Sequence, residues 1–382
     1  MTDSIAPILA RIADLAPAFA ERAAADDANG TFPRRNFEDL HAAGALALTI
    51  PAARGGAGGG LAAALSAVNA VARADPSTAL VLAMHYTNTY AATHRQDWPA
   101  HLVARVLAAN AARVSLLNTA QVEPDIGSPS HGALPETIAR KRDGQWHITG
   151  HKIYSTGIPM MQWMLVLAVT DEAEPRLGNF LVPMDAPGVE IRPSWNAAGM
   201  RATRSDDLIM TDVAVPLEDV IGLAPASLGI RRDPREIAWY FTLISAVYDG
   251  VAQAARDWLV QFTTSRIPAS LGQPLASLPR IQDAIGQVEV LLGVNRRLMR
   301  GLAEDYDAGR DFGADAGIVK HTVIENAQQA VLLAVEVGGN PGFSRDNPLE
   351  RHLRNVLGGK VHAPQNNLIR ANLGRAAALA SA

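Results

Sequence analysis

The sequence predicts a mainly α-helical protein with a β domain in the middle of the chain. Two observations support this fold class. Helical spacing of apolar residues dominates the first and last thirds, whereas the middle third has short apolar runs and turn signals. The 382 residues are 48% apolar but only 5% aromatic, so alanine and leucine fill most of the interior and favour helices. We expect three units, at residues 1–112, 113–222 and 223–382.

The first unit begins with an amphipathic helical pattern, in which apolar residues recur three and four positions apart. Examples are Ile8, Ile12, Leu15 and Phe19. Residues 51–60 interrupt the pattern with a glycine-rich stretch. This stretch lacks the lysine and the preceding strand of a phosphate-binding loop, so we interpret it as a flexible loop near a substrate entrance. Asp75 then stands where it can cap the next helix.

The second unit carries strand signals. Residues 163–169 form a short apolar run of the kind that a buried strand has. The pair Asp143 and Gly144 separates residues 137–142 from 145–149, which predicts a tight β-hairpin. Several prolines divide the later part into short pieces. We expect a small antiparallel barrel or sandwich.

The third unit returns to long amphipathic stretches. They span residues 237–264, 278–307 and 314–337. Long helices joined by short connections predict an antiparallel helical bundle. Such helices depend on mutual packing more than on intrinsic propensity, so we expect one continuous core.

Composition excludes several classes of function. The net charge of -4 gives no basic surface for nucleic acid, and the absence of cysteine excludes disulfides and thiolate chemistry. No apolar run is long enough for a membrane span, and the N-terminus does not resemble a signal peptide. We therefore expect a cytoplasmic protein without a membrane partner. His147 and His151 are four residues apart on a strand, where that spacing does not form one face, so we expect no metal site. Residues 231–232 and Arg235 form a basic patch that suits either solvent or an anionic cofactor.

Ordered motifs then connect the three units to a known family. These motifs are residues 146–157 (WHITGHKIYSTG), 180–183 (FLVP), 199–203 (GMRAT), 211–216 (TDVAVP) and 337–343 (VGGNPGF). In this order they resemble the acyl-CoA dehydrogenase superfamily over nearly the whole chain. The resemblance implies an N-terminal helical domain, a small β-barrel and a C-terminal four-helix bundle. It also implies a flavin cofactor, FAD or FMN, and a homotetramer.

The resemblance assigns flavin-binding roles to several residues. It implies that Tyr154 stacks near the isoalloxazine ring and that Thr156 bonds its redox-active edge. Adjacent strand residues face opposite ways, so only one of Ser155 and Thr156 faces the ring, and the motif favours Thr156. The hydroxyl of the family's preceding strand is replaced by Val122, and the polar neighbours Gln121 and Asn118 are candidates to substitute for it.

Two further segments resemble parts of the family that hold the flavin from a distance. Arg266 stands where the family has an arginine that binds the flavin diphosphate of a neighbouring subunit. Two extra residues separate it from the following glycine, so FAD and FMN both remain open. Gly338 and Gly339 resemble the glycine turn that precedes the last helices.

The catalytic glutamate of many family members is absent, because Ala363 occupies its place. The neighbouring run, from Arg354 and Asn355 to His362, is similar to the flavin monooxygenases of this fold, notably the dibenzothiophene monooxygenase type. The resemblance implies a two-component monooxygenase. In such an enzyme a flavin C4a-hydroperoxide oxygenates a small organic substrate, and a separate reductase supplies the reduced flavin. His85 is the second histidine implied for that pocket, and Asn118 completes the set of candidate catalytic residues.

Two alternatives stay open. Some family members place the catalytic glutamate on the first helix of the bundle, at the position of Tyr240 here, and Glu236 lies one turn earlier. A shift of one turn restores a base and makes the chain an FAD-dependent acyl-CoA dehydrogenase. The second alternative is a flavin-binding protein that has lost catalysis.

Overall fold

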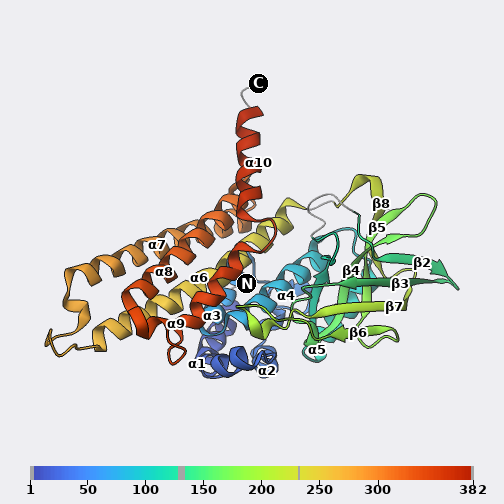
Figure 1. Cartoon of the computed structure of the whole chain (residues 1–382). Coiled ribbons are helices and arrows are strands. Elements are labelled where there is room, and N and C mark those ends of the chain that lie inside the picture. The colour runs from blue at the N-terminus through green and yellow to red at the C-terminus, as the bar shows by residue number, and fades with distance from the viewer. Residues whose placement is uncertain (1–3, 128–133, 231–232, 380–382) are drawn as a thin grey trace.

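The computed structural model describes residues 4–127, 134–230 and 233–379, so the predicted basic pair at residues 231–232 lies outside the described residues. The N-terminal helices pack against one another beside the sheet (Figure 1). They are α1 (Ile5–Asn29), α2 (Arg34–Ala42), α3 (Leu61–Ala74), α4 (Pro76–His94) and α5 (Ala100–Ala112). Asp75 caps α4 as predicted, because its carboxylate accepts bonds from the main-chain nitrogens of Ser77 and Thr78.

The middle of the chain folds into one eight-stranded sheet (Figure 1). The strands are β1 (Leu116–Ala120), β2 (Ile138–Arg142), β3 (Gln145–Lys152), β4 (Met161–Thr170), β5 (Arg176–Pro183), β6 (Val189–Arg192), β7 (Asp207–Pro216) and β8 (Val220–Pro225). Their order is β6-β7-β3-β2-β4-β5-β8, and β1 pairs with β4.

The hairpin between β2 and β3 confirms the turn prediction. Arg142 pairs directly with Gln145, and Asp143 and Gly144 both have positive φ, as a two-residue hairpin turn requires. The sheet is mixed rather than purely antiparallel, since β4 pairs in parallel with both β1 and β2. The alternation of apolar and polar residues in the sequence did not indicate either of these parallel pairings.

The last part of the chain forms the predicted helical bundle. Its helices are α6 (Pro234–Ser265), α7 (Pro279–Asp307), α8 (Asp315–Phe343), α9 (Leu349–Leu357) and α10 (Asn366–Leu379). Helices α6, α7 and α8 pack along their length, whereas α10 projects from the body (Figure 1). No helix among the described residues is long and apolar enough to cross a membrane.

One hydrophobic core runs from the bundle into the sheet domain. Helix α6 supplies much of it and packs against α3, α4, α8 and α9. Helix α4 also contacts β1 and the short 3-10 turn η5 (Arg201–Thr203) that precedes β7. These contacts place β1 and η5 beside α4, which itself packs against α6 of the bundle.

One local expectation was wrong. The segment with Tyr154, Ser155 and Thr156 is not strand, because β3 ends at Lys152 and Tyr154 adopts a left-handed conformation with φ of 59°. Strand alternation therefore does not decide which hydroxyl faces a ligand. The expected glycine turn is present, because Gly339 leaves the helical conformation with φ of 58° and ψ of -142° and kinks α8.

Candidate active site at the junction of sheet and bundle

A buried ion pair fixes the chain just before the segment of residues 153–157. The ammonium of Lys152 lies 2.5 Å from Oε1 of Glu123, and both side chains are almost fully buried. The hydroxyl and amide of Thr137 donate to the same carboxylate. Burial raises the pKa of Glu123, but the bonds from Lys152 and Thr137 outweigh it and the net pKa is lowered. The pair ties the end of β3 to the chain that follows β1.

The segment beyond this pair offers features that suit a flavin. Tyr154 is 60% exposed, with its ring edge-on to Trp195 at 6.2 Å between ring centroids. Ser155 is fully buried, and its hydroxyl has no hydrogen-bond partner among the described residues. Thr156 is only partly buried and shares a hydrogen bond of 2.9 Å with the Ser205 hydroxyl. An accessible aromatic ring, an unpaired buried hydroxyl and a second hydroxyl can contact the face and the polar edge of a flavin.

An amide and hydroxyl network lies next to this segment. Nδ2 of Asn118 donates to the main-chain oxygen of Thr156 at 2.9 Å. Nδ2 of Asn88, on α4, donates weakly to Oδ1 of Asn118 at 3.4 Å, and the Thr119 hydroxyl donates to Oδ1 of Asn88 at 2.6 Å. Gln121 follows β1 directly and is partly exposed. The structure therefore brings Asn118 and Thr156 together, as expected from the sequence.

A chain of contacts leads from Thr156 to the bundle. The Ser205 hydroxyl shares a further bond with Thr203, whose hydroxyl donates to the main-chain oxygen of Met200. The amide of Met200 donates to Oδ1 of Asn355 at 2.7 Å. Asn355 lies in the last turn of α9, and the 3-10 turn η8 (Gly358–Lys360) follows the helix. The pair of Arg354 and Asn355 thus joins the sheet domain to the turn that leads to residue 362.

His362 pairs with a tyrosine from the centre of α6. Its Nε2 and the hydroxyl of Tyr248 share a hydrogen bond of 2.7 Å. Burial of the imidazole, with the nearby Lys320 cation, lowers the pKa of His362 to about 4, so it is neutral at neutral pH. Burial and the neighbouring Tyr240 raise the pKa of Tyr248 well above its ordinary value. The two groups form an uncharged hydrogen-bonding pair, and the adjacent Ala363 has no proton-accepting group.

His85 occupies a different environment from the one expected for a pocket histidine. It is fully buried, its Nε2 bonds the main-chain oxygen of Leu46 at 3.0 Å, and its Nδ1 accepts from the amide of Leu117 at 3.3 Å. Burial lowers its pKa to about 4. With both nitrogens bonded to main chain, the geometry favours a role in holding β1 against α4.

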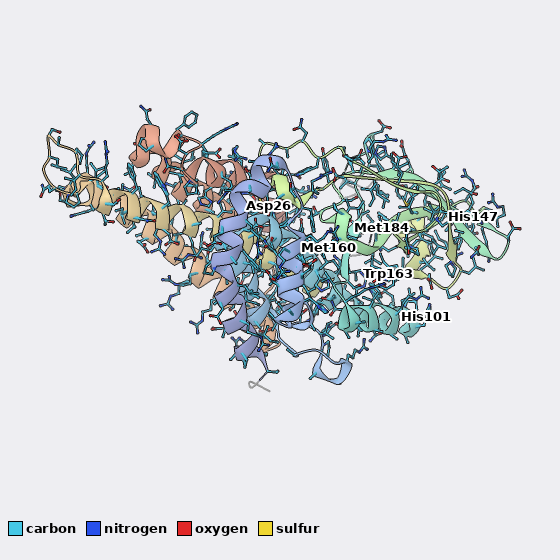
Figure 2. All side chains as sticks on the ribbon, turned by 90° about the horizontal axis from the view of Figure 1, so that it is seen from below. Asp26, His101, His147, Met160, Trp163 and Met184 are labelled. Carbon is cyan, nitrogen blue, oxygen red and sulfur yellow. The ribbon has the colours of Figure 1, made fainter. Side chains whose placement is uncertain are left out.

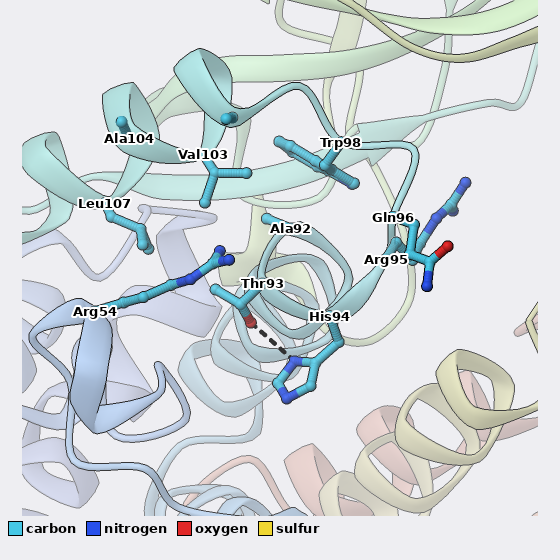
Figure 3. A pocket seen from close by; sticks show the side chains of 11 residues that line it. Arg54, Ala92, Thr93, His94, Arg95, Gln96, Trp98, Val103, Ala104 and Leu107 are labelled. Atoms are coloured by element: carbon cyan, nitrogen blue, oxygen red, sulfur yellow. Dashed lines mark hydrogen bonds between the residues drawn. The ribbon is translucent and has the colours of Figure 1, made fainter.

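Glu236 lies at a distance from His362. Its carboxylate accepts a bond of 3.1 Å from Arg95, which also pairs with Asp97. From Glu236 to Tyr248 the axis of α6 rises by about 18 Å at roughly 1.5 Å per residue. Figure 3 shows Arg95 at a cavity of about 640 Å³ between the end of α4 and α5. This cavity is lined by none of the predicted site residues.

The remaining predicted flavin ligands lie elsewhere in the chain. Arg266 is exposed at the end of α6, on the turn toward α7 at the far end of the bundle (Figure 1). Gly338 is packed against Trp258, near that same end of α6. One chain does not bring Arg266, Gly338 or Gly339 to Tyr154.

No cluster of metal-ligating side chains occurs among the described residues. His147 and His151 both lie on β3 but bind different acids, Asp212 at 3.2 Å and Asp207 at 2.8 Å. Figure 2 shows His147 at the end of the sheet away from the helices.

Sequence reasoning missed three residues of the junction. Asn88 lies in α4, whose apolar pattern gave no reason to select a polar residue as functional. Tyr248 and Lys320 lie in α6 and α8, whose apolar patterns predicted only packing in the hydrophobic core. Polar residues inside apolar helical stretches are the signal that identifies them, because buried polar groups need partners.

Comparison with known proteins gives a consistent result. Family models match the chain in consecutive order, described as the acyl-CoA dehydrogenase N-terminal domain (residues 9–95), middle domain (118–213) and C-terminal domain (241–378). The sequence is 32% identical over 362 residues to the putative acyl-CoA dehydrogenase YdbM of Bacillus subtilis, with 94% of this chain and 93% of that protein covered.

Solved structures share the fold. Butyryl-CoA dehydrogenase from Megasphaera elsdenii superposes with a TM-score of 0.88 at 21% identity, covering 98% of each chain. KijD3 in complex with FMN and a dTDP-linked amino-keto sugar superposes with a TM-score of 0.81 at 27% identity, covering 100% of this chain and 95% of that one.

Proposed function

Since this chain belongs to the acyl-CoA dehydrogenase family and is a flavin-dependent oxidoreductase, we propose that it oxygenates a small organic substrate. One observation carries the proposal. The family's base position is Ala363, and the side chain beside it, His362, forms an uncharged pair with Tyr248. Position 363 thus lacks the family's carboxylate base, and the pair beside it offers groups that donate and accept hydrogen bonds.

The cofactor is a flavin, and Tyr154, Ser155 and Thr156 are the residues that would hold its ring. A bound reduced flavin supplies the two electrons that activate dioxygen. One oxygen atom enters the substrate and the other leaves as water. With FAD as the flavin, Arg266 of a second copy would contact the diphosphate, because that residue lies at the far end of its own bundle. The resemblance to the family is the basis for proposing a homotetramer.

The chain's own residues have three tasks in this proposal. His362 and Tyr248 present hydrogen-bonding groups where oxygen reacts. Asn118 and Asn88 present amides at the sheet edge that orient the substrate. The surrounding core excludes water, which strengthens each polar contact. The electrons come from a separate reductase, since the sequence has no dinucleotide-binding glycine motif.

The rival function is dehydrogenation of an acyl-CoA, which the names of the relatives favour. It requires a base near the flavin, and Glu236 is the available candidate. Two observations argue against Glu236 as this base. Its carboxylate accepts a hydrogen bond from Arg95, and it lies about 18 Å along α6 from Tyr248.

Anaerobic mixing with acyl-CoA thioesters of several chain lengths tests the proposal. The absorbance of the bound flavin should remain unchanged with every thioester, because no base stands at residue 363. Rapid bleaching by any simple acyl-CoA would overturn the oxygenase proposal. A Glu236→Gln variant that abolished such bleaching would then identify the relocated base.

A further inference from the structure

Two side chains of helix α8 bind the chain segment of residues 360–366, which carries His362. The ammonium of Lys360 pairs with Glu325, and Nδ2 of Asn366 donates to the same carboxylate at 2.8 Å. Between these points, Nζ of Lys320 donates to the main-chain oxygens of His362 at 3.2 Å and Pro364 at 2.9 Å. Alternate residues of the segment are thus held by two side chains of one helix.

Lys320 is unusual among these groups because its side chain is 0% exposed. Within the part of the chain that the structure describes, no carboxylate lies within ion-pair distance of it. Its neighbours are the two carbonyl oxygens and the ring of Phe241, at 5.8 Å. A buried cation without a carboxylate is unfavourable unless its hydrogen bonds are well satisfied. The hydrogen bonds to the two main-chain carbonyls therefore stabilise the buried Lys320 ammonium.

We propose that Lys320 is a positioning residue, whose ammonium holds the main chain at His362 and Pro364 so that the imidazole meets the Tyr248 hydroxyl. Ala363 lies between the two carbonyls, so the same hydrogen bonds fix the main chain at that position. The catalytic consequence of this role rests on the proposed function. The geometric role does not, and it can be measured without substrate.

Charged and titratable groups reach this segment from two helices. Lys320 and Glu325 come from α8, where Glu325 pairs with Lys360 of the segment, and Tyr248, with Tyr240 beside it, comes from α6. The Lys320 cation adds to burial in lowering the pKa of His362 to about 4. Loss of the ammonium removes this repulsion and also frees the segment to move toward solvent. Both effects raise the pKa of His362.

Histidine-labelled protein followed by NMR tests the role. The full chain is titrated with pH, and the His362 signal is assigned by its loss in His362→Ala. In Lys320→Met the pKa of His362 should rise from about 4 toward the ordinary value of 6.5. The matched control is Glu325→Gln, which weakens the contact with Lys360 but leaves Lys320 in place, and it should raise the pKa of His362 by less than Lys320→Met does.

An unchanged His362 titration in Lys320→Met would overturn the role, and so would an equal shift in Glu325→Gln. If Lys320→Met does not fold, Lys320→Gln replaces it, since a neutral amide can still donate to one carbonyl. A raised pKa of His362 in that variant supports the role of the ammonium, and a wild-type titration there contradicts it. Bleaching by acyl-CoA together with the expected shift would overturn only the proposed oxygenation.

Discussion

Removal of the Tyr248 hydroxyl should separate oxygen transfer from simple flavin oxidation. In Tyr248→Phe, His362 loses a hydrogen bond of 2.7 Å. The imidazole nitrogen then loses its side-chain partner at a partly buried position. A buried polar group left unpaired costs about 1–3 kcal/mol. We therefore expect the free energy of unfolding to fall by about that amount.

The same hydrogen bond also affects the rate of oxygen transfer if it orients His362 at the place where oxygen reacts. Loss of about 1–3 kcal/mol in the transition state slows productive transfer by about five- to 150-fold. Reduced flavin still reacts with oxygen, so hydrogen peroxide replaces product. The assay supplies reduced flavin and oxygen and measures the ratio of oxygenated product to released peroxide. His362→Ala should change this ratio in the same direction.

Tyr86→Phe is the matched control. Tyr86 is fully buried on α4, and its hydroxyl donates to the main-chain oxygen of Ala45 at 2.7 Å. The two variants lose the same atom and a bond of equal length, so they should lose similar stability. Only Tyr248→Phe should change the product ratio. If both variants lose stability and neither changes the ratio, the pair of Tyr248 and His362 is structural and the reasoning is refuted.

Three further predictions concern other parts of the molecule. Glu123→Gln should lower the free energy of unfolding by about 3–5 kcal/mol in urea titrations, because it leaves the buried Lys152 ammonium unpaired; a loss below about 1 kcal/mol would show that water reaches the site. Burial lowers the pKa of His85 from 6.5 to about 4, so between these values the unfolded chain binds a proton that the folded protein does not. Stability should therefore fall on acidification through that window, by up to about 3 kcal/mol from this group, and a His85→Gln variant whose pH dependence matched the wild type would contradict the assignment. Arg266→Ala should weaken flavin binding, measured by fluorescence quenching, without changing the stability of the single chain; unaltered affinity would place Arg266 in solvent.

Much of the fold followed from local patterns. The hairpin at Asp143 and Gly144 was predictable because that turn needs residues that tolerate positive φ, and the cap at Asp75 because a carboxylate satisfies free main-chain amides. The long bundle helices were predictable from apolar spacing. The parallel pairings of β4 were not, since they depend on contacts between strands far apart in sequence.

The site was predictable in part. Motif resemblance selected His362, Asn118 and Thr156, which the structure places along one junction. It did not show that His85 would have both ring nitrogens bonded to main chain, because those partners come from distant segments. It also missed Tyr248 and Lys320, whose polar ends matter only once α6 and α8 close around residue 362.

The central claim is that the flavin of this protein reacts productively with oxygen. Flavin-loaded protein is reduced without oxygen and then mixed with oxygenated buffer while absorbance is followed. We expect reoxidation to proceed through a transient absorbing species that decays more slowly than it forms, and we expect His362→Ala to shorten its lifetime. Direct single-phase return of the oxidised spectrum, with the same rate in wild type and His362→Ala, would contradict the account.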